Sequence, residues 1–91
     1  MSNQGNSQHE RLEDTVLQEV GKIEISNTQE YRVILMVDGT TNKTVLSVQK
    51  WWRASAKEDW KMGKGFRLDS KTARKLGHLV LDGALELDKL R

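Results

Sequence analysis

The stretch VQKWWRASAKEDWKMGKGFRLD, residues 48–69, spans the end of one predicted strand, a polar loop and the next predicted strand. It contains all three tryptophans of the chain and its one phenylalanine, interleaved with six lysine or arginine residues. In a small domain the few aromatic side chains normally lie in the core, where each buries a large apolar area. Because these aromatics lie among cations, the tryptophans are candidates for contact with a ligand. Phe66, like Met62, is instead predicted to belong to the core.

Four short runs have the composition of strands. Residues 22–26, KIEIS, alternate apolar and polar side chains, and residues 31–39, YRVILMVDG, are rich in β-branched residues and end at Asp-Gly. The turn TTNK leads into residues 44–52, TVLSVQKWW, and GFRLD at 65–69 forms the fourth run. This order predicts an α+β fold, in which a four-stranded antiparallel sheet is followed by a C-terminal helix.

Residues 70–91 have the spacing of an amphipathic helix, which Asp69 or Ser70 can cap. Apolar or small residues recur at intervals of three and four along one stripe: Ala73, Leu76, Val80, Gly83, Leu87 and Leu90. Three more leucines lie outside the stripe, so the helix is apolar on more than one face and a single sheet would not cover it. Gly77 and Gly83 leave two interpretations open: close approach of a second helix, or a break near Gly83.

The first twenty residues differ in character from the rest. Residues 1–20 carry four Asp or Glu against one Arg, and the first ten are almost entirely polar, so we expect a flexible acidic tail. Apolar residues at helical spacing permit a short helix in its second half: Leu12, Val16, Leu17 and Val20. The predicted organisation is a tail at 1–20 and one binding domain at 21–91.

The composition excludes several classes of function. The chain has no cysteine, which excludes a disulfide framework, a thiolate metal site and a cysteine nucleophile. His9 and His78 have no neighbour at metal-ligand spacing, and we expect His78 at the surface or an interface. The sequence MGKG at 62–65 lacks the earlier glycine and the following Ser or Thr of a phosphate-binding loop. No hydroxyl lies in a nucleophile pattern, so we expect no enzyme, no cofactor and no metal site.

The chain also lacks membrane signals. No signal-peptide pattern opens it, and no apolar run approaches the roughly 20 residues that cross a bilayer. We therefore expect a soluble intracellular protein: cytoplasmic and nucleoid-associated if bacterial or phage, nuclear if eukaryotic. Its 91 residues suit one domain with a modest core, to which a second copy would add buried surface.

Positive charge is concentrated in one third of the chain. Residues 43–75 hold ten Lys or Arg against three Asp or Glu, a net of +7 in a chain of net charge +2. Such a block suits a polyanionic partner, although a solvated basic face has the same composition. Aromatic rings that stack on unpaired bases, at about 1–3 kcal/mol per base, beside cations that follow the phosphates, would bind single-stranded nucleic acid. Two alternatives remain: a protein-interaction or regulatory module that meets an acidic partner, and duplex DNA binding through the basic helix start SKTARK at 70–75.

Two segments resemble a known family. VLSVQKWW at 45–52 and MGKGFRLDSKTARKL at 62–76 are similar to the core of the transcriptional coactivator family called positive cofactor four and its bacterial single-strand-binding relatives. The shared frame is an Ile/Val-x-x-aromatic strand end, a loop of about ten residues, a Lys-Gly-apolar-x-Leu strand and a capped helix. The resemblance implies a curved four-stranded antiparallel sheet, a homodimer joined by its helices, and sequence-tolerant binding of single-stranded DNA. The roles that the resemblance implies are transcription coactivation, replication or repair. RNA and transcription or replication proteins are further expected partners.

The same resemblance implies a binding site. In the family, an aromatic residue at the end of the third strand stacks on a base and a lysine before the fourth strand meets phosphate, which corresponds here to Trp52, or its neighbour Trp51, and to Lys64. Lys43 also matches a basic position. The candidate nucleic-acid-binding residues are Trp52, Trp51, Lys64, Lys43, Lys50, Arg53, Trp60, Lys61, Arg67, Tyr31 and Arg32.

Two positions depart from the family pattern. Gln49 stands where the eukaryotic members have an arginine, and Thr40 stands where a turn aromatic is expected. Both changes predict weaker or differently distributed binding, which Trp60 and Tyr31 could compensate.

The adjacent tryptophans give conflicting predictions. Strict alternation over 44–52 groups Trp52 with Leu46 and Val48, on the face expected to be core, and Trp51 with the intervening polar residues, on the face expected to be outward. Alternation therefore favours Trp51 as the stacking residue. The family resemblance favours Trp52, which requires the strand to bend or end before it.

Overall fold

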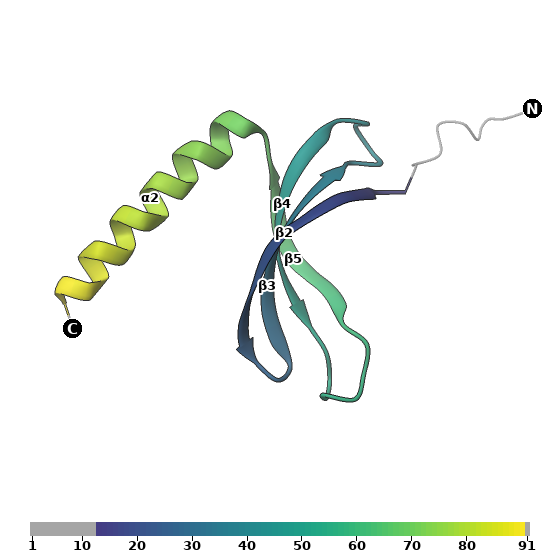
Figure 1. Ribbon diagram of the computed structural model, residues 1–91, viewed down its shortest axis with the longest axis horizontal. Helices are drawn as coiled ribbons and strands as arrows, with labels where there is room; N and C mark the ends of the chain where they lie inside the picture. Colours follow the sequence, from purple (N-terminus) through teal and green to yellow (C-terminus); the bar gives the residue numbers. More distant parts are fainter. Residues whose placement is uncertain (1–12, 91) are drawn as a thin grey trace, which may run out of the picture.

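The computed structural model describes residues 13–90. Four antiparallel strands are paired in sequence order as a meander, and one helix follows them (Figure 1). The elements are β2 (Thr15–Ser26), β3 (Gln29–Val37), β4 (Thr44–Trp52), β5 (Lys61–Leu68) and α2 (Ser70–Lys89). The α+β fold predicted from the sequence is therefore confirmed. The sheet is not strongly curled, in contrast to the curved sheet that the resemblance implies.

Strand β2 corrects the sequence-based prediction for residues 12–20. Of the described residues in this segment, 15–20 lie in strand β2 and none is helical, so the predicted domain boundary at residue 21 falls inside β2. Register shifts interrupt its pairing with β3 between Val16 and Gln18, Glu19 and Gly21, and Glu24 and Ser26. Each bulge adds one residue to the two-residue period of a strand, which places apolar residues three apart and imitates a helical pattern. Residues 1–12 of the tail predicted at 1–20 lie outside the described residues.

Strands β3 and β4 pair without a register shift, from Gln29 opposite Trp52 to Val37 opposite Thr44. Their alternation defines two faces. The inner face carries the buried side chains: Glu30, Ile34, Met36, Ser47 and Gln49. The open face carries the alternate residues: Tyr31, Val33, Leu35, Leu46, Val48 and Trp52. The two groupings were predicted correctly, but the prediction of which one points outward is wrong, because Ser47 and Gln49 are buried and their side chains share a hydrogen bond of 2.7 Å.

Strand β5 is longer than predicted, since it begins at Lys61 and not at residue 65. Met62 and Phe66 are 47% and 50% exposed, so the prediction that they belong to the core is wrong. Phe66 lies opposite Val48, on the open face, and no second layer of the described chain covers that face.

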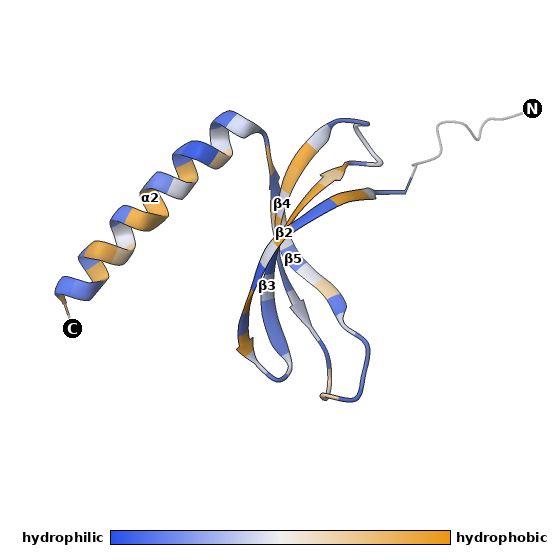
Figure 2. Cartoon of the chain, viewed as in Figure 1, coloured by the Kyte–Doolittle hydropathy of each residue, from blue (hydrophilic) through white to orange (hydrophobic). Residues whose placement is uncertain are grey.

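Helix α2 is capped by Asp69, whose carboxylate accepts a hydrogen bond of 2.8 Å from the Thr72 N–H. The helix continues through Gly83, so of the two interpretations left open for its glycines, a break there is wrong. It contacts the sheet only at β4 and β5 and then projects away from it (Figure 1). None of its residues is buried, although apolar segments run along it (Figure 2). Within residues 13–90, no helix has the length and apolarity needed to cross a bilayer.

Candidate nucleic-acid interface

Trp52 occupies the end of β4, where three strands meet. Its cross-strand neighbours are Gln29, which begins β3, and Lys61, which begins β5. The indole lies on the open face and is 43% exposed. The Nζ atom of Lys61 lies 5.2 Å from the ring centroid, within the range of a cation–π contact. A large aromatic face is thus held at the sheet end, partly open to solvent and beside a positive charge.

A shallow groove of about 390 Å³ runs along this indole. Five residues from the three strands line it: Gln29, Lys50, Trp52, Gly63 and Lys64. Tyr31 lies directly across from Lys50 on β3 and is 45% exposed, so a second aromatic ring borders the same surface. Two lysines and two aromatic rings therefore share one face within a few strand spacings of each other.

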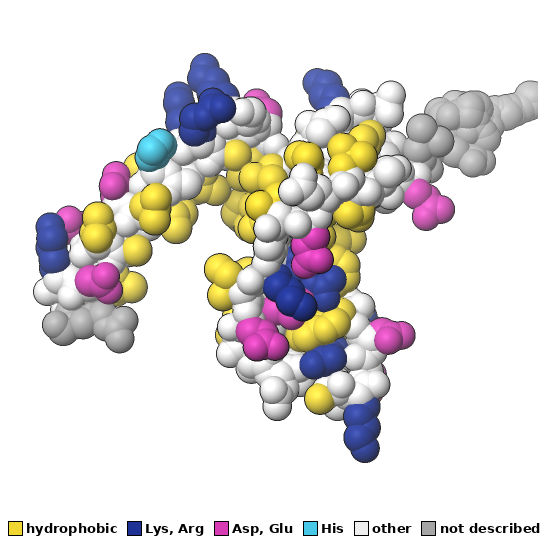
Figure 3. Space-filling model, viewed as in Figure 1, with side chains coloured by type: hydrophobic (Ala, Val, Ile, Leu, Met, Phe, Trp, Pro, Cys, Tyr) yellow, Lys and Arg dark blue, Asp and Glu magenta, His cyan; other side chains and the backbone are white. Residues whose placement is uncertain are grey.

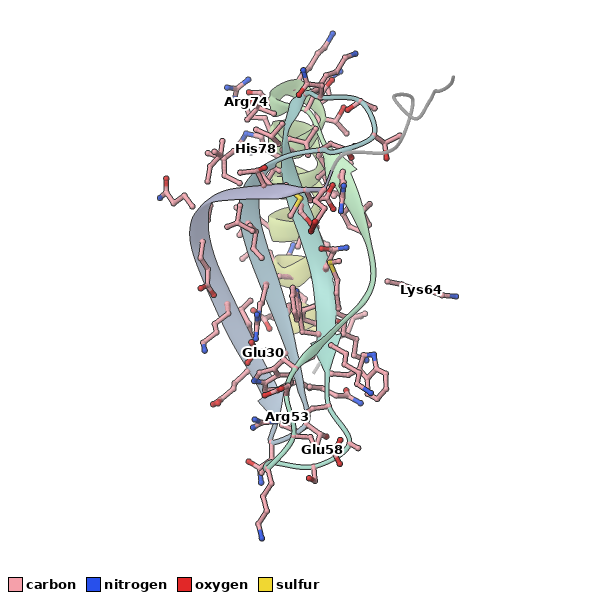
Figure 4. The ribbon with its side chains drawn as sticks, turned by 90° about the vertical axis from the view of Figure 1, so that its right-hand side faces the viewer. Glu30, Arg53, Glu58, Lys64, Arg74 and His78 are labelled. Carbon is pink, nitrogen blue, oxygen red and sulfur yellow. The ribbon has the colours of Figure 1, made fainter. Side chains whose placement is uncertain are left out.

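A bulge in β5 creates the space that the indole occupies. The register shifts between Gln49 and Trp51, which leaves Lys50 opposite both Gly63 and Lys64. A Cβ atom on Gly63 would lie 2.7 Å from the carbonyl oxygen of Lys50 and 3.4 Å from Cδ1 of Trp52. Only glycine allows β5 to approach this closely. The side chain of Lys64, the next residue, extends away from the sheet into solvent (Figure 4).

Trp51 lies on the inner face, where it belongs to a column of alternating indole and guanidinium groups. The Cζ atom of Arg32 lies 4.1 Å from the Trp51 ring centroid and 5.7 Å from that of Trp60. The Cζ atom of Arg53 lies 4.1 Å from the Trp60 ring centroid. We call these four residues the inner column. Both indoles of the column are thus already in contact with the chain's own cations.

Hydrogen bonds fix the inner column in place. Arg32 forms an ion pair with Glu30, whose side chain is 1% exposed. The Nε atom of Arg53 donates to the carbonyl oxygen of Asn27 at 2.8 Å, and its backbone N–H donates to that of Thr28 at 3.0 Å. The column therefore ties the loop at 53–60 to β3 and to the turn at 27–28, and both guanidinium groups are engaged within the chain. Figure 4 shows Glu30 and Arg53 at this end of the sheet.

Arg67 is engaged in the same way near the opposite end of the sheet. Its two Nη atoms contact the carboxylates of Asp14 at 2.8 Å and Asp38 at 2.7 Å, and Asp14 also accepts from the Gly39 N–H at 2.7 Å. The hydrogen bond from Arg67, with smaller contributions from backbone N–H groups of the turn, lowers the pKa of Asp38. The pairing with Asp14 and Asp38 raises the pKa of Arg67. This cluster holds the start of β2 against the β3–β4 turn.

The structure brings together five of the eleven predicted residues on the open face: Trp52, Tyr31, Lys50, Lys61 and Lys64. Four others form the inner column. Arg67 forms the cluster with the two aspartates, and Lys43 precedes β4, nine positions from Trp52, or about 30 Å along an extended strand. Of the two departures, Gln49 is buried on the inner face and Thr40 is exposed in the turn before β4.

Gln29 lines the groove and was missed by the sequence analysis, which left it outside the predicted strands. Its position follows from the hairpin register, since only Asn27 and Thr28 separate β2 from β3 and Gln29 then faces the last residue of β4. Among residues 13–90, no group of His, Cys, Asp or Glu side chains is arranged to hold a metal ion. The chain matches no family model, no curated protein and no solved structure.

Proposed function

We propose that this protein binds single-stranded nucleic acid through the open face at the end of the sheet, without sequence preference and without turnover. The observation that carries the proposal is the exposed indole of Trp52, which lies in a groove lined by Lys50 and Lys64 with Lys61 over its ring. Stacking on such a ring tolerates any base, and the lysines supply charge for the phosphates. Tyr31 offers a second stacking surface beside the first.

The strand is proposed to run across the sheet end, with one base on Trp52 and its phosphates near Lys61 and Lys64. A single strand suits this site better than a duplex because a paired base does not expose its ring face. The resemblance to positive cofactor four supports DNA as the ligand and a role in transcription, replication or repair. It also supports a homodimer that pairs through α2, whose exposed leucines need a cover.

Tryptophan fluorescence tests the proposal. The full chain is titrated with a single-stranded oligonucleotide, with a duplex of equal length as competitor and with salt varied. We expect saturable quenching that the duplex competes weakly and that weakens as salt rises. Preference for the duplex would assign binding to the basic first turns of α2. Binding without quenching would mean that the open face attracts the oligonucleotide by positive charge alone, as expected for the protein-interaction alternative.

The same titration with an RNA oligonucleotide of equal length decides between the two nucleic acids. A site that uses stacking and phosphate charge alone binds both to a similar extent, since the 2′-hydroxyl needs a specifically placed polar partner. A tenfold or larger preference would show that a polar group at the groove reads the sugar, and Gln29 is the first residue to substitute.

A further inference from the structure

Lys61 lies over the exposed indole of the proposed site. Its Nζ atom is 5.2 Å from the ring centroid of Trp52, and the two residues are cross-strand partners at the end of the sheet. One edge of the indole already lies beside β5, since a Cβ atom on Gly63 would be 3.4 Å from the Cδ1 atom of Trp52. The lysine therefore covers ring surface that the backbone leaves open.

A stacked base and the Lys61 ammonium group exclude each other from this side of the ring. Stacked aromatic rings have centroids about 4.5–7 Å apart. The ammonium group, at 5.2 Å from the Trp52 centroid, lies within the same interval. A base that stacks here must therefore displace the lysine, and the lost cation–π contact lowers the affinity for that base about two- to fivefold.

The described chain does not hold Lys61 in this position. Within residues 13–90, no carboxylate or carbonyl oxygen pairs with its ammonium group, and the side chain is exposed. The cation over Trp51 differs, because Arg32 is also paired with the buried carboxylate of Glu30. A lysine has a flexible four-carbon stem, so its ammonium group can leave the ring while the backbone stays in place. Lys61 is thus free to move, whereas Arg32 is held.

Other cations of the chain are arranged differently. Lys64, on the same strand, extends away from the sheet into solvent (Figure 4). Figure 3 shows Lys and Arg gathered over the first turns of α2, a helix that contains no Phe, Trp or Tyr. These cations can attract phosphate, but a base that stacks on Trp52 does not displace them. Phosphate attraction and access to the ring therefore meet at Lys61.

We infer that Lys61 couples stacking on Trp52 to phosphate binding, so that the site favours bases on a phosphate backbone over uncharged aromatic molecules. The inference rests on the proposed function, because it concerns the same indole. A base with a phosphate beside it displaces the ammonium group and supplies an anion with which that group can pair. A base without phosphate displaces the ammonium group into water and supplies no new partner for it. Lys61 is therefore a specificity-determining residue of the proposed site.

Salt dependence separates the two roles of Lys61. The affinity of the full chain for a single-stranded DNA oligonucleotide is measured by tryptophan quenching over a range of salt concentrations. The slope of log affinity against log salt reports phosphate contacts, and the value extrapolated to 1 M salt, where log salt is zero, reports the part of binding that does not depend on phosphate charge.

Lys61→Ala is expected to change both quantities in opposite directions. The slope should decrease by about 0.7, the value of one phosphate contact on a single strand. The affinity extrapolated to 1 M salt should increase about two- to fivefold, because no cation has to leave the ring. The variant should therefore bind more weakly than the wild type at low salt and more tightly near 1 M salt.

Lys64→Ala is the matched control, since Lys64 lines the same groove but points into solvent. Its slope should decrease by a similar amount, and its affinity extrapolated to 1 M salt should remain within about twofold of the wild-type value. An extrapolated affinity of Lys61→Ala that is unchanged or lower would overturn the inference while leaving the proposed function intact. A wild-type chain without saturable quenching would overturn the proposed function, and the inference with it.

Nuclear magnetic resonance of the Lys61 side chain gives a second readout. Protons held over an indole ring are shifted upfield by its ring current, so the Lys61 ε-methylene signal should lie upfield in the free chain. It should return to the ordinary lysine position in Trp52→Ala and in the wild type saturated with the oligonucleotide. A signal that stays upfield in the complex would show that the lysine still covers the ring, and would overturn the inference.

Discussion

Trp51 and Trp52 are neighbours in sequence and each has one cation over its ring, yet the two cations differ in kind. Trp51 faces arginine, whose flat guanidinium group stacks on the indole and forms an ion pair with Glu30 at the same time. Trp52 faces lysines, whose ammonium groups stay hydrated and leave the ring 43% exposed. The choice between arginine and lysine therefore separates a structural tryptophan from one that is available to a ligand.

The sharpest test of this difference is Trp51→Ala. The substitution removes the base of the inner column, so the free energy of unfolding should fall by about 2–4 kcal/mol. Affinity for a single strand, measured where the variant is still folded, should remain within about twofold. Urea denaturation and the oligonucleotide titration measure the two effects. A stable variant with lost affinity would reverse the roles of the two tryptophans.

Trp52→Ala is expected to give the opposite result. Affinity for a single strand should fall by about 1–3 kcal/mol, because one stacked base loses its platform. The free energy of unfolding should change by less than about 1 kcal/mol, since the ring is partly exposed. Because Trp51 and Trp60 remain, unfolding can still be followed by fluorescence. Equal losses of stability in both variants would assign both rings to the fold and contradict the proposed site.

The lysines of the open face are tested by salt dependence. Lys64→Ala should lower the slope of log affinity against log salt by roughly one phosphate contact. Lys22→Ala is the matched control, since Lys22 lies opposite Arg32 on the inner face and undergoes the same loss of charge. Its slope should not change. A similar decrease in both variants would mean that net charge alone, and not the open face, attracts the strand.

Arg67 is a third arginine of the inner face. Substitution of its partner Asp38 is expected to give the smallest effect, a change in how stability depends on pH. Because the pKa of Asp38 is lowered, its ionised carboxylate stabilises the fold at pH values above the ordinary pKa of 3.8. This contribution is lost as the pH falls through the lowered pKa. Wild-type stability should therefore fall more steeply than that of Asp38→Asn between about pH 5 and pH 2. Urea midpoints across that range measure the difference. Parallel curves would show that the cluster adds no pH-dependent stability.

The strand order and the helix could be predicted from the sequence because turn residues and period-two runs mark each element locally. The bulges of β2 could not, since a bulge reproduces the three-residue spacing of a helix. The resemblance paired Lys64 with Trp52, and the two residues line one groove, with Lys64 inside β5 and not before it. The choice between the tryptophans was undecided because alternation groups residues by face without saying which face is covered. Which face is covered at Trp51 depends on Arg32 and Trp60, which are not its neighbours in sequence.

Strand β2 is a long edge strand with exposed apolar side chains, among them Leu17, Val20 and Ile23. A flat edge of this kind would offer its free backbone groups to any passing strand and seed fibrillar assembly. The three bulges make the edge irregular and remove the continuous ladder that such growth needs. At the other edge, β5 has its own bulge beside Lys64. The protein can therefore display an apolar sheet without offering the regular backbone ladder through which strands polymerise.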